Sequence, residues 1–207
     1  MPVSSIFSQL QRIICREKQM AGDLFYYLST LPMLRWGEKP PLSYEDFLAG
    51  SREALGSEAA AWLAQVSLVP TAAPATALAV RWQEKETFMR NVLAELRASR
   101  RRQSAGPWLR PTTELSSGDR KRIEDAMGLA ATWEREQALD QLRWQCLDDL
   151  GVGHVFDLTL LEIYALRLRL LEKQQSRQTE PGREAFAALV AAGVEQAGRP
   201  DVRISEA

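Results

Sequence analysis

Residues 23–48 read DLFYYLSTLPMLRWGEKPPLSYEDFL, and this is the most informative stretch of the chain. Its first part is a run of apolar and aromatic residues that predicts a helical turn from Leu24 to Leu31. Pro32 and the pair Pro40-Pro41 cannot lie inside a helix, because proline lacks the N–H and clashes with the preceding turn. Ser43 and Asp46 have the spacing of a capping box, so a second helix is expected to begin at Ser43.

The connector between these two helices forms an elbow that carries Trp36 and Gly37. Its prolines restrict the backbone, so we expect the elbow to be ordered although it is not helical. We expect Trp36 to pack against helix residues such as Phe47.

Apolar residues recur at helical spacing along most of the chain, and no segment shows the two-residue alternation of a strand. Linkers are predicted at 69–76 and 104–117, where Pro, Ala, Ser and Thr gather. The predicted helices cover 5–20, Ser43 to Leu55, Ser57 to Leu68, Thr76 to Gln103, 116–150 with a break near Gly128, a stretch after Asp157 that ends at 180–182, and 183–197. We therefore predict an all-α fold in which long antiparallel helical hairpins form an elongated bundle.

Three regions are expected along the chain. Residues 1–22 form an N-terminal extension, predicted to be helical from the spacing of its apolar residues, Ile6, Leu10, Ile13 and Ile14. Met20 is an alternative start, so the extension is either an extra helix or lies before the true start. Residues 23–197 form a single all-α domain, and residues 198–207 form a frayed tail.

Specific buried faces and helix ends can also be predicted. Gly106-Pro107 is expected to stop the long helix, Gly151 to follow the end of its helix, and Asp157 to cap the next one. Four helical tryptophans are predicted to be core residues: Trp62, Trp82, Trp133 and Trp144. The two buried stripes are predicted to consist of Leu78, Trp82, Met89, Val92, Leu93 and Leu96, and of Leu158, Leu161, Ala165, Leu168 and Leu171.

Composition sets bounds on function. Hydrophobic residues make up 45% of the 207 residues and the net charge is −1, so no global field favours nucleic acid or an anionic membrane. The two cysteines, Cys15 and Cys146, are too few for a secreted disulfide scaffold, so both are expected as reduced thiols in a cytosolic protein. Residues 59–80 lack charge, but two prolines and several polar residues argue against a membrane span. No signal peptide is expected.

Residues 23–48, and the elbow within them most of all, resemble the opening of the DUF2764 family, and residues 81–98 and 133–173 resemble that family's central helix and C-terminal hairpin. The family is similar to a short form of the C-type (eukaryotic d-type) subunit of V-type ATPases. The resemblance implies a cytoplasmic, non-catalytic adaptor between the central rotor stalk and the membrane rotor ring, peripheral to the inner membrane through the complex.

Motifs for chemistry are weak. There is no phosphate-binding loop and no zinc-ligand spacing, so neither cofactor nor metal is expected. His154 beside Asp157 could act as a general base, but a turn histidine is the simpler interpretation. Cys146 is interpreted as a core residue. Glu136 and Asp140 lie on one helix face with Arg143, which favours a solvated ion-pair face over an acid–base pair.

Candidate partner-binding residues come from two other features. The segment from Arg81 to Arg110 is rich in basic residues, and these either complement the helix dipole or dock on an acidic partner. Connector tryptophans either pin a loop to the core or anchor an interface. The candidate residues are Trp36, Arg97, Arg100, Arg101, Arg102 and Trp108.

The function expected from these observations is binding without catalysis, within a V-type ATPase. The alternatives are a generic helical scaffold unrelated to the ATPase and, in third place, a small helical enzyme that uses His154.

Overall fold

The computed structural model describes residues 22–69, 76–113 and 116–177. These residues form helices and connectors with no strand, which confirms the all-α class for the part that is described. The chain divides into two units, Met1–Glu172 and Lys173–Ala207. The packing reported below lies in the first unit, and the elongated bundle remains a prediction. The predicted helices at 5–20 and 183–197 and the tail at 198–207 lie outside the described residues.

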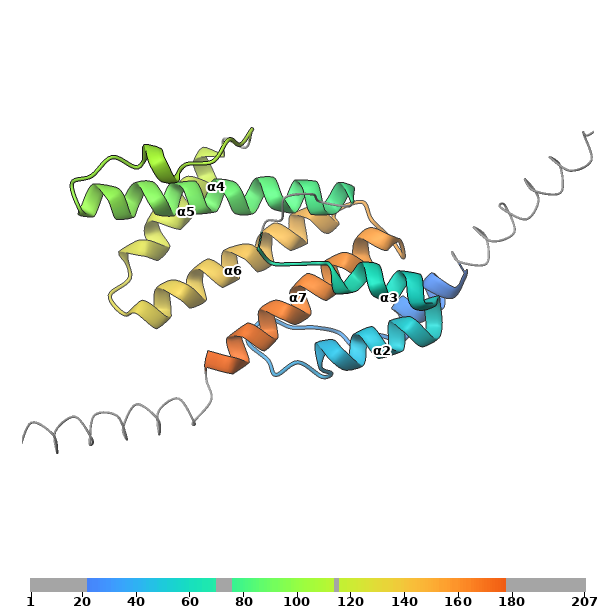
Figure 1. Cartoon of the computed structure of the whole chain (residues 1–207). Coiled ribbons are helices and arrows are strands. Elements are labelled where there is room, and N and C mark those ends of the chain that lie inside the picture. Colours follow the sequence, from blue (N-terminus) through green and yellow to red (C-terminus); the bar gives the residue numbers. More distant parts are fainter. Residues whose placement is uncertain (1–21, 70–75, 114–115, 178–207) are drawn as a thin grey trace, which may run out of the picture. The chain divides into compact units, whose positions relative to one another are not determined.

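Figure 1 shows the order of the helices along the chain. Residues 22–30 are helical. The other elements are α2 (Tyr44–Leu55), α3 (Ser57–Ala64), α4 (Ala77–Arg100), the 3₁₀ turn η1 (Gly106–Trp108), α5 (Ser117–Gly128), α6 (Thr132–Gly151) and α7 (Leu158–Arg177).

The elbow has the predicted limits. The helix ends before Pro32, and Ser43 forms a capping box in which its hydroxyl accepts from the Asp46 N–H at 3.0 Å. The elbow is also fixed to α7, because the Tyr164 hydroxyl donates to the Pro32 carbonyl at 3.0 Å. Its order therefore comes from a contact far away in sequence as well as from its prolines.

The prediction that Trp36 packs against Phe47 was wrong. Trp36 packs on Trp144 of α6, with ring centroids 5.6 Å apart. Phe47 instead lies among tyrosines, with its ring centroid 5.3 Å from that of Tyr164 and 6.4 Å from that of Tyr27. Trp36 and Phe47 therefore pack in different parts of the hydrophobic core.

Helix bounds agree with the predictions in most places. The break near Gly128 is confirmed, and so is Asp157 as a cap, since its carboxylate accepts from the Leu160 N–H at 3.0 Å. The α3 helix ends at Ala64 and not at Leu68. Gly151 still belongs to α6, and it is Gly153, with φ of +84°, that adopts the left-handed conformation beyond the helix.

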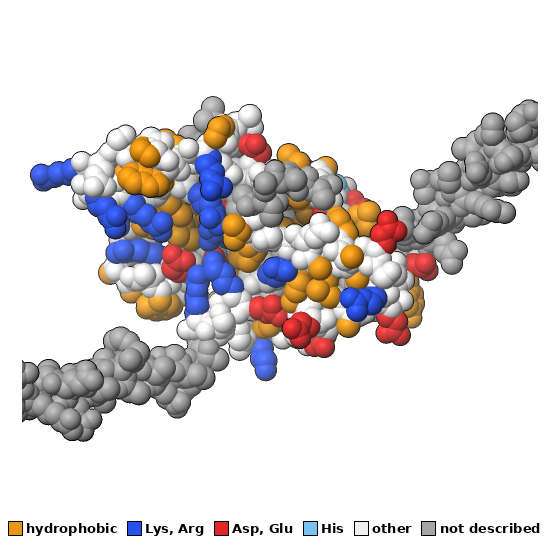
Figure 2. Space-filling model, in the orientation of Figure 1, with side chains coloured by type: hydrophobic (Ala, Val, Ile, Leu, Met, Phe, Trp, Pro, Cys, Tyr) orange, Lys and Arg blue, Asp and Glu red, His pale blue; other side chains and the backbone are white. Residues whose placement is uncertain are grey.

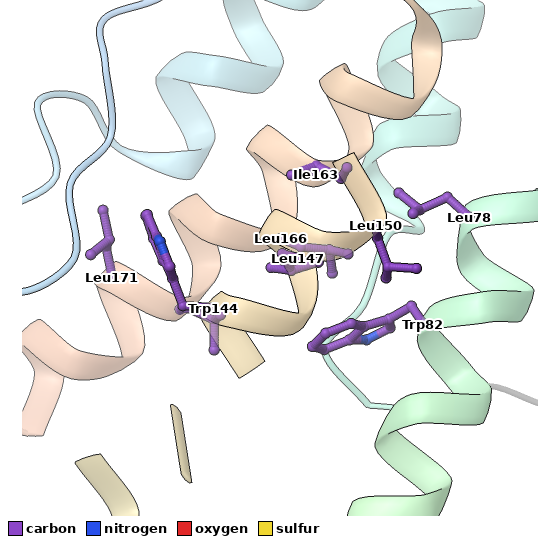
Figure 3. Close-up of a cluster of buried hydrophobic side chains, with 9 residues drawn as sticks. Leu78, Trp82, Trp144, Leu147, Leu150, Ile163, Leu166 and Leu171 are labelled. Carbon is purple, nitrogen blue, oxygen red and sulfur yellow. The ribbon is translucent and has the colours of Figure 1, made fainter. Parts of the chain in front are cut away.

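Three hydrophobic clusters make up the core. The first joins the start of α4 to α6 and α7, as Figure 3 shows for Trp82, Leu147 and Leu166. The second joins helix 22–30, α2 and α3 to the other face of α7. The third joins the middle of α4 to α5 and the first half of α6. The central helices α4, α6 and α7 each contribute to two clusters.

The predicted stripes are largely buried. In the first stripe five residues are buried and Leu96 is partly buried against the third cluster. Leu158, however, is 45% exposed, because it directly follows the Asp157 cap and lies in the first turn of α7. Trp133 was also wrongly predicted as core: it lies in the first turn of α6 and is 67% exposed.

A cluster of buried charges connects α4 to α6. Arg143 of α6 makes two hydrogen bonds to the carboxylate of Glu86, from Nε to Oε2 at 2.8 Å and from Nη2 to Oε1 at 3.0 Å. Its Nη1 donates to Asp140 at 2.7 Å, and Arg90 donates to Glu86 at 2.8 Å. Glu86 and Asp140 are 2% and 1% exposed, so the solvated face predicted for Asp140 and Arg143 was wrong.

Electrostatics explain why the buried Arg143 stays charged. Burial alone would lower the pKa of Arg143, but the hydrogen bonds and charges of Glu86 and Asp140 raise it above its ordinary value. The two carboxylates are balanced by two guanidinium groups. A cluster that is complete in this way is tolerated in a core, whereas removal of one member leaves a buried charge without compensation.

We expect Arg143→Met to lower the free energy of unfolding by about 3–5 kcal/mol, because it removes the guanidinium that donates to both buried carboxylates, Glu86 and Asp140. Arg120→Met is the matched control. Arg120 pairs with Glu95 at 2.8 Å, but both side chains are more than a third exposed, and such pairs contribute about 1 kcal/mol or less. Urea unfolding followed by circular dichroism measures both. Equal midpoints for the two variants would contradict this role for Arg143.

Glu162 of α7 is a second buried carboxyl group, 3% exposed. One of its oxygens, Oε1, has no hydrogen-bond partner among the described residues. Burial raises the pKa of Glu162, and a hydrogen bond with the Thr76 side chain offsets part of that shift. The raised pKa means that folding favours the protonated form.

The stability of the protein should therefore depend on this group above pH 4.5, the ordinary value of a glutamate. A raised folded-state pKa means that stability is lost as the pH rises from 4.5 through the folded-state value. Glu162→Gln should match the natural chain near pH 4 and become more stable than it toward neutral pH. The exposed Glu53→Gln is the control. Unfolding curves from pH 4 to 8 test this, and a pH-independent difference would refute it.

Candidate partner-binding site

The predicted arginine residues lie where α4 ends. Arg101 is the C-cap of α4, and Arg102 adopts a left-handed conformation with φ of +55°. The Gln103 N–H donates to the Ala98 carbonyl at 2.9 Å and the Arg102 N–H to the Ser99 carbonyl at 3.0 Å. This pair of bonds is a Schellman motif, which usually has glycine at the left-handed position.

The predicted stop at Gly106-Pro107 was therefore wrong. The helix has already ended at Arg100, and Pro107 instead lies in the short turn η1. Sequence reasoning missed the end because arginine is a good helix former and gives no signal for a left-handed backbone.

Arg100 differs from its neighbours because its side chain is engaged. Its Nη2 donates to the Met127 carbonyl at 2.8 Å, which places the end of α5 beside the end of α4. The turn from α5 to α6 is fixed in the same way, since Arg135 donates to the carbonyls of Leu129 at 2.6 Å and Ala130 at 3.1 Å. Arg100 is thus part of the scaffold.

The connector after α4 is held along the helix. Asn91 and Arg110 exchange two hydrogen bonds, from Asn91 Nδ2 to the Arg110 carbonyl at 2.7 Å and from the Arg110 N–H to Asn91 Oδ1 at 3.0 Å. Further along, Glu84 accepts from the Thr113 N–H at 2.9 Å. These contacts cross about twenty residues or more of sequence, and no sequence pattern predicted them.

The remaining predicted residues are exposed on this fixed frame. Arg97, Arg101 and Arg102 are exposed, and no carboxylate of the described residues forms an ion pair with them. Trp108 is 58% exposed. We call these four residues the arginine–tryptophan end. Figure 2 shows Lys and Arg side chains gathered on the side of the molecule where α4 ends.

Other apolar side chains lie on the connector and on the adjoining turn. Leu109 follows Trp108 in the connector. Leu129 and Trp133 flank the turn from α5 to α6, which lies next to the Arg100–Met127 hydrogen bond. All three are exposed, Trp133 most of all. Exposed tryptophans and arginines together are typical of binding surfaces, because both residue types are enriched among interface hot spots.

Trp36 lies elsewhere. It is half-buried against the cluster of α4, α6 and α7, where Trp144 contacts it. Trp36 therefore pins the elbow, which was one of the two roles considered for it, and it does not join the arginine–tryptophan end.

His154 and Asp157 are in contact, with 2.6 Å between Nδ1 and Oδ2. Burial acts to raise the pKa of Asp157, but the hydrogen bond with His154 and those with the Leu160 and Thr159 amides outweigh it, so the pKa lies below its ordinary value. Because the other carboxylate oxygen caps α7, the pair forms a capping turn.

Cys146 is a free, half-buried thiol that packs against the first cluster. Burial, with a smaller contribution from nearby carboxylates, raises its pKa to about 11, so it is a neutral thiol at physiological pH and a poor nucleophile. It lines a small groove between α4, α5 and α6 in which Asp119 pairs with Lys85 and Arg122. Cys15 lies outside the described residues.

Comparison of the chain with protein-family models, with curated proteins and with solved structures finds no match. Within the described ranges, no group of His, Cys, Asp and Glu side chains could hold a metal ion. None of the described helices is long and apolar enough to cross a membrane.

Backbone strain at Arg102 gives a test of how the site is built. Arg102→Gly should stabilise the protein by roughly 0.5–1 kcal/mol, because glycine adopts the left-handed conformation without steric cost. Arg101→Gly removes the same charge at a position with ordinary helical dihedrals, so it should be neutral or destabilising. If urea unfolding shows no advantage for Arg102→Gly over Arg101→Gly, the Schellman geometry is wrong.

Proposed function

We propose that this protein is a non-catalytic adaptor that docks on an acidic protein surface through the arginine–tryptophan end. The observation that carries the proposal is the exposure of Arg97, Arg101, Arg102 and Trp108 on a backbone that is itself fixed by hydrogen bonds.

Rigidity supports binding at this end. A loop that is already ordered loses little conformational freedom when a partner binds, so more of the contact energy appears as affinity. Arg100 and Arg135 bond to backbone carbonyls at the end of α5 and in the turn that follows it. Asn91 bonds to the backbone of Arg110, just beyond Trp108. The free guanidinium groups then supply long-range attraction toward negative charge and speed up the encounter.

The partners we propose are the central stalk subunits and the membrane rotor ring of a V-type ATPase. This rests on the resemblance of the elbow and the two later helical blocks to the DUF2764 family. The proposal places the protein in the cytoplasm, at the inner membrane through its partners, with no contact with nucleic acid. Its mechanism is mechanical coupling through a stiff helical body, in which no residue needs catalytic chemistry.

Charge reversal tests the docking end directly. Arg97→Glu with Arg101→Glu should weaken binding to the purified V-type ATPase of the host at least tenfold at low salt. The loss should shrink at high salt, because exposed charges are screened within about 10 Å at 0.1 M ionic strength. Arg100 is left in place, because its bond to the Met127 carbonyl belongs to the scaffold.

The matched control is Lys39→Glu with Arg52→Glu, two exposed basic residues of the elbow and α2. This variant changes net charge equally and should bind like the natural chain. Equal weakening by both variants would assign the effect to net charge and remove the arginine–tryptophan end from the interface. If the natural chain binds neither the stalk nor the ring, the ATPase is not the partner.

A further inference from the structure

A second exposed apolar surface lies where helix 22–30 meets the loop from α6 to α7. Phe25 and Phe156 are in contact there, with ring centroids 4.4 Å apart, yet they are 53% and 40% exposed. The same loop exposes Val152 and Val155 at 79% and 71%, and Leu158, the first residue of α7, is 45% exposed. We call these five residues the Phe156 patch.

The conformation of the loop favours this exposure. Phe156 has φ of +51°, which is an outlier for a bulky residue. The neighbouring Asp157 fixes the backbone through its cap on α7. Exposed apolar side chains that gather in one region are typical of a surface that another segment covers.

The two segments that carry the patch, residues 22–34 and 144–166, have acidic residues but no Lys or Arg. Asp23, at the start of helix 22–30, and Asp149, near the end of α6, are both exposed. Asp157 directly follows Phe156 in the sequence. An occupant should therefore combine an apolar face with basic side chains.

Residues 5–20 of the same chain have that chemistry. Ile6, Leu10, Ile13 and Ile14 recur at helical spacing, and three basic residues, Arg12, Arg16 and Lys18, outnumber the single acidic Glu17. The segment joins the described chain at Gly22, three residues before Phe25. We propose that residues 5–20 dock on the Phe156 patch of their own chain as a basic amphipathic helix.

Two other occupants fit less well. A second copy that used the same patch on both subunits would bring like carboxylates together, since a two-fold interface is self-complementary. An anionic membrane would be repelled by Asp23, Asp149 and Asp157. The chain's own segment has the opposite charge, and its attachment at Gly22 gives it a high effective concentration at the patch.

A nitroxide spin label at Cys15 tests the proposal in the full chain. Cys146→Ala leaves Cys15 as the only thiol, and in a helix residue 15 lies about half a turn away from the apolar stripe, so the label does not disturb the contact. We expect the label to broaden the methyl signals of Val152 and Leu158 in NMR spectra of the dilute, singly labelled chain.

Val155→Lys should abolish most of that broadening, because it places a positive charge where the basic helix docks. Met33→Lys is the control, since Met33 is 77% exposed in the elbow and outside the patch. Equal broadening in the Val155→Lys chain would mean a tethered segment that does not dock, and would overturn the proposal. Absence of broadening would also overturn it, and so would broadening seen only when labelled and isotope-enriched chains are mixed.

Discussion

The ion pair between Glu86 and Arg143 connects α4 to α6 at a depth where water cannot replace either partner. The pair is the link between the two helices in a charge cluster that Arg90 and Asp140 complete, so the register of the helices is constrained by more than apolar packing. The first and third clusters lie on either side of this pair along α4, with Trp82 in one and Met89 in the other. Movement of α4 past α6 would disrupt both clusters and would also separate Glu86 from Arg143.

This constraint extends to the surface proposed for binding. A fixed α4 fixes its own C-terminus, where Arg102 turns the chain and Arg100 reaches the end of α5. Asn91, one turn beyond Glu86, then holds the returning connector through Arg110. The exposed arginines and Trp108 thus stand on a frame whose position depends on the buried pair. The mechanical coupling that we propose requires this continuity between the core and the docking surface.

The helices and most of their buried faces could be predicted from sequence, because periodic leucines and the Ser43 and Asp157 caps are local signals. The buried charges could not. Asp140 and Arg143 have the spacing of a surface ion pair, and only Glu86, more than fifty residues earlier, makes them a core cluster. The candidate binding site could likewise be predicted only in part. The position of Trp108 in a connector left open whether it pins a loop or lies exposed, and the roles of Arg100 and Arg102 depend on Met127 and on a left-handed backbone, which the local sequence does not signal.

A double-mutant cycle on Glu86 and Arg143 measures how strongly this pair holds α4 to α6. Glu86→Gln, Arg143→Met and the combined variant would be unfolded in urea, and the coupling free energy obtained from the three losses of stability. Residues in one buried network couple by about 0.5–3 kcal/mol, and we expect a value in the upper half of that range. The exposed pair Glu95 and Arg120 should couple by about 1 kcal/mol or less. Additive losses for Glu86 and Arg143 would show that the pair does not hold α4 to α6, and would contradict the account.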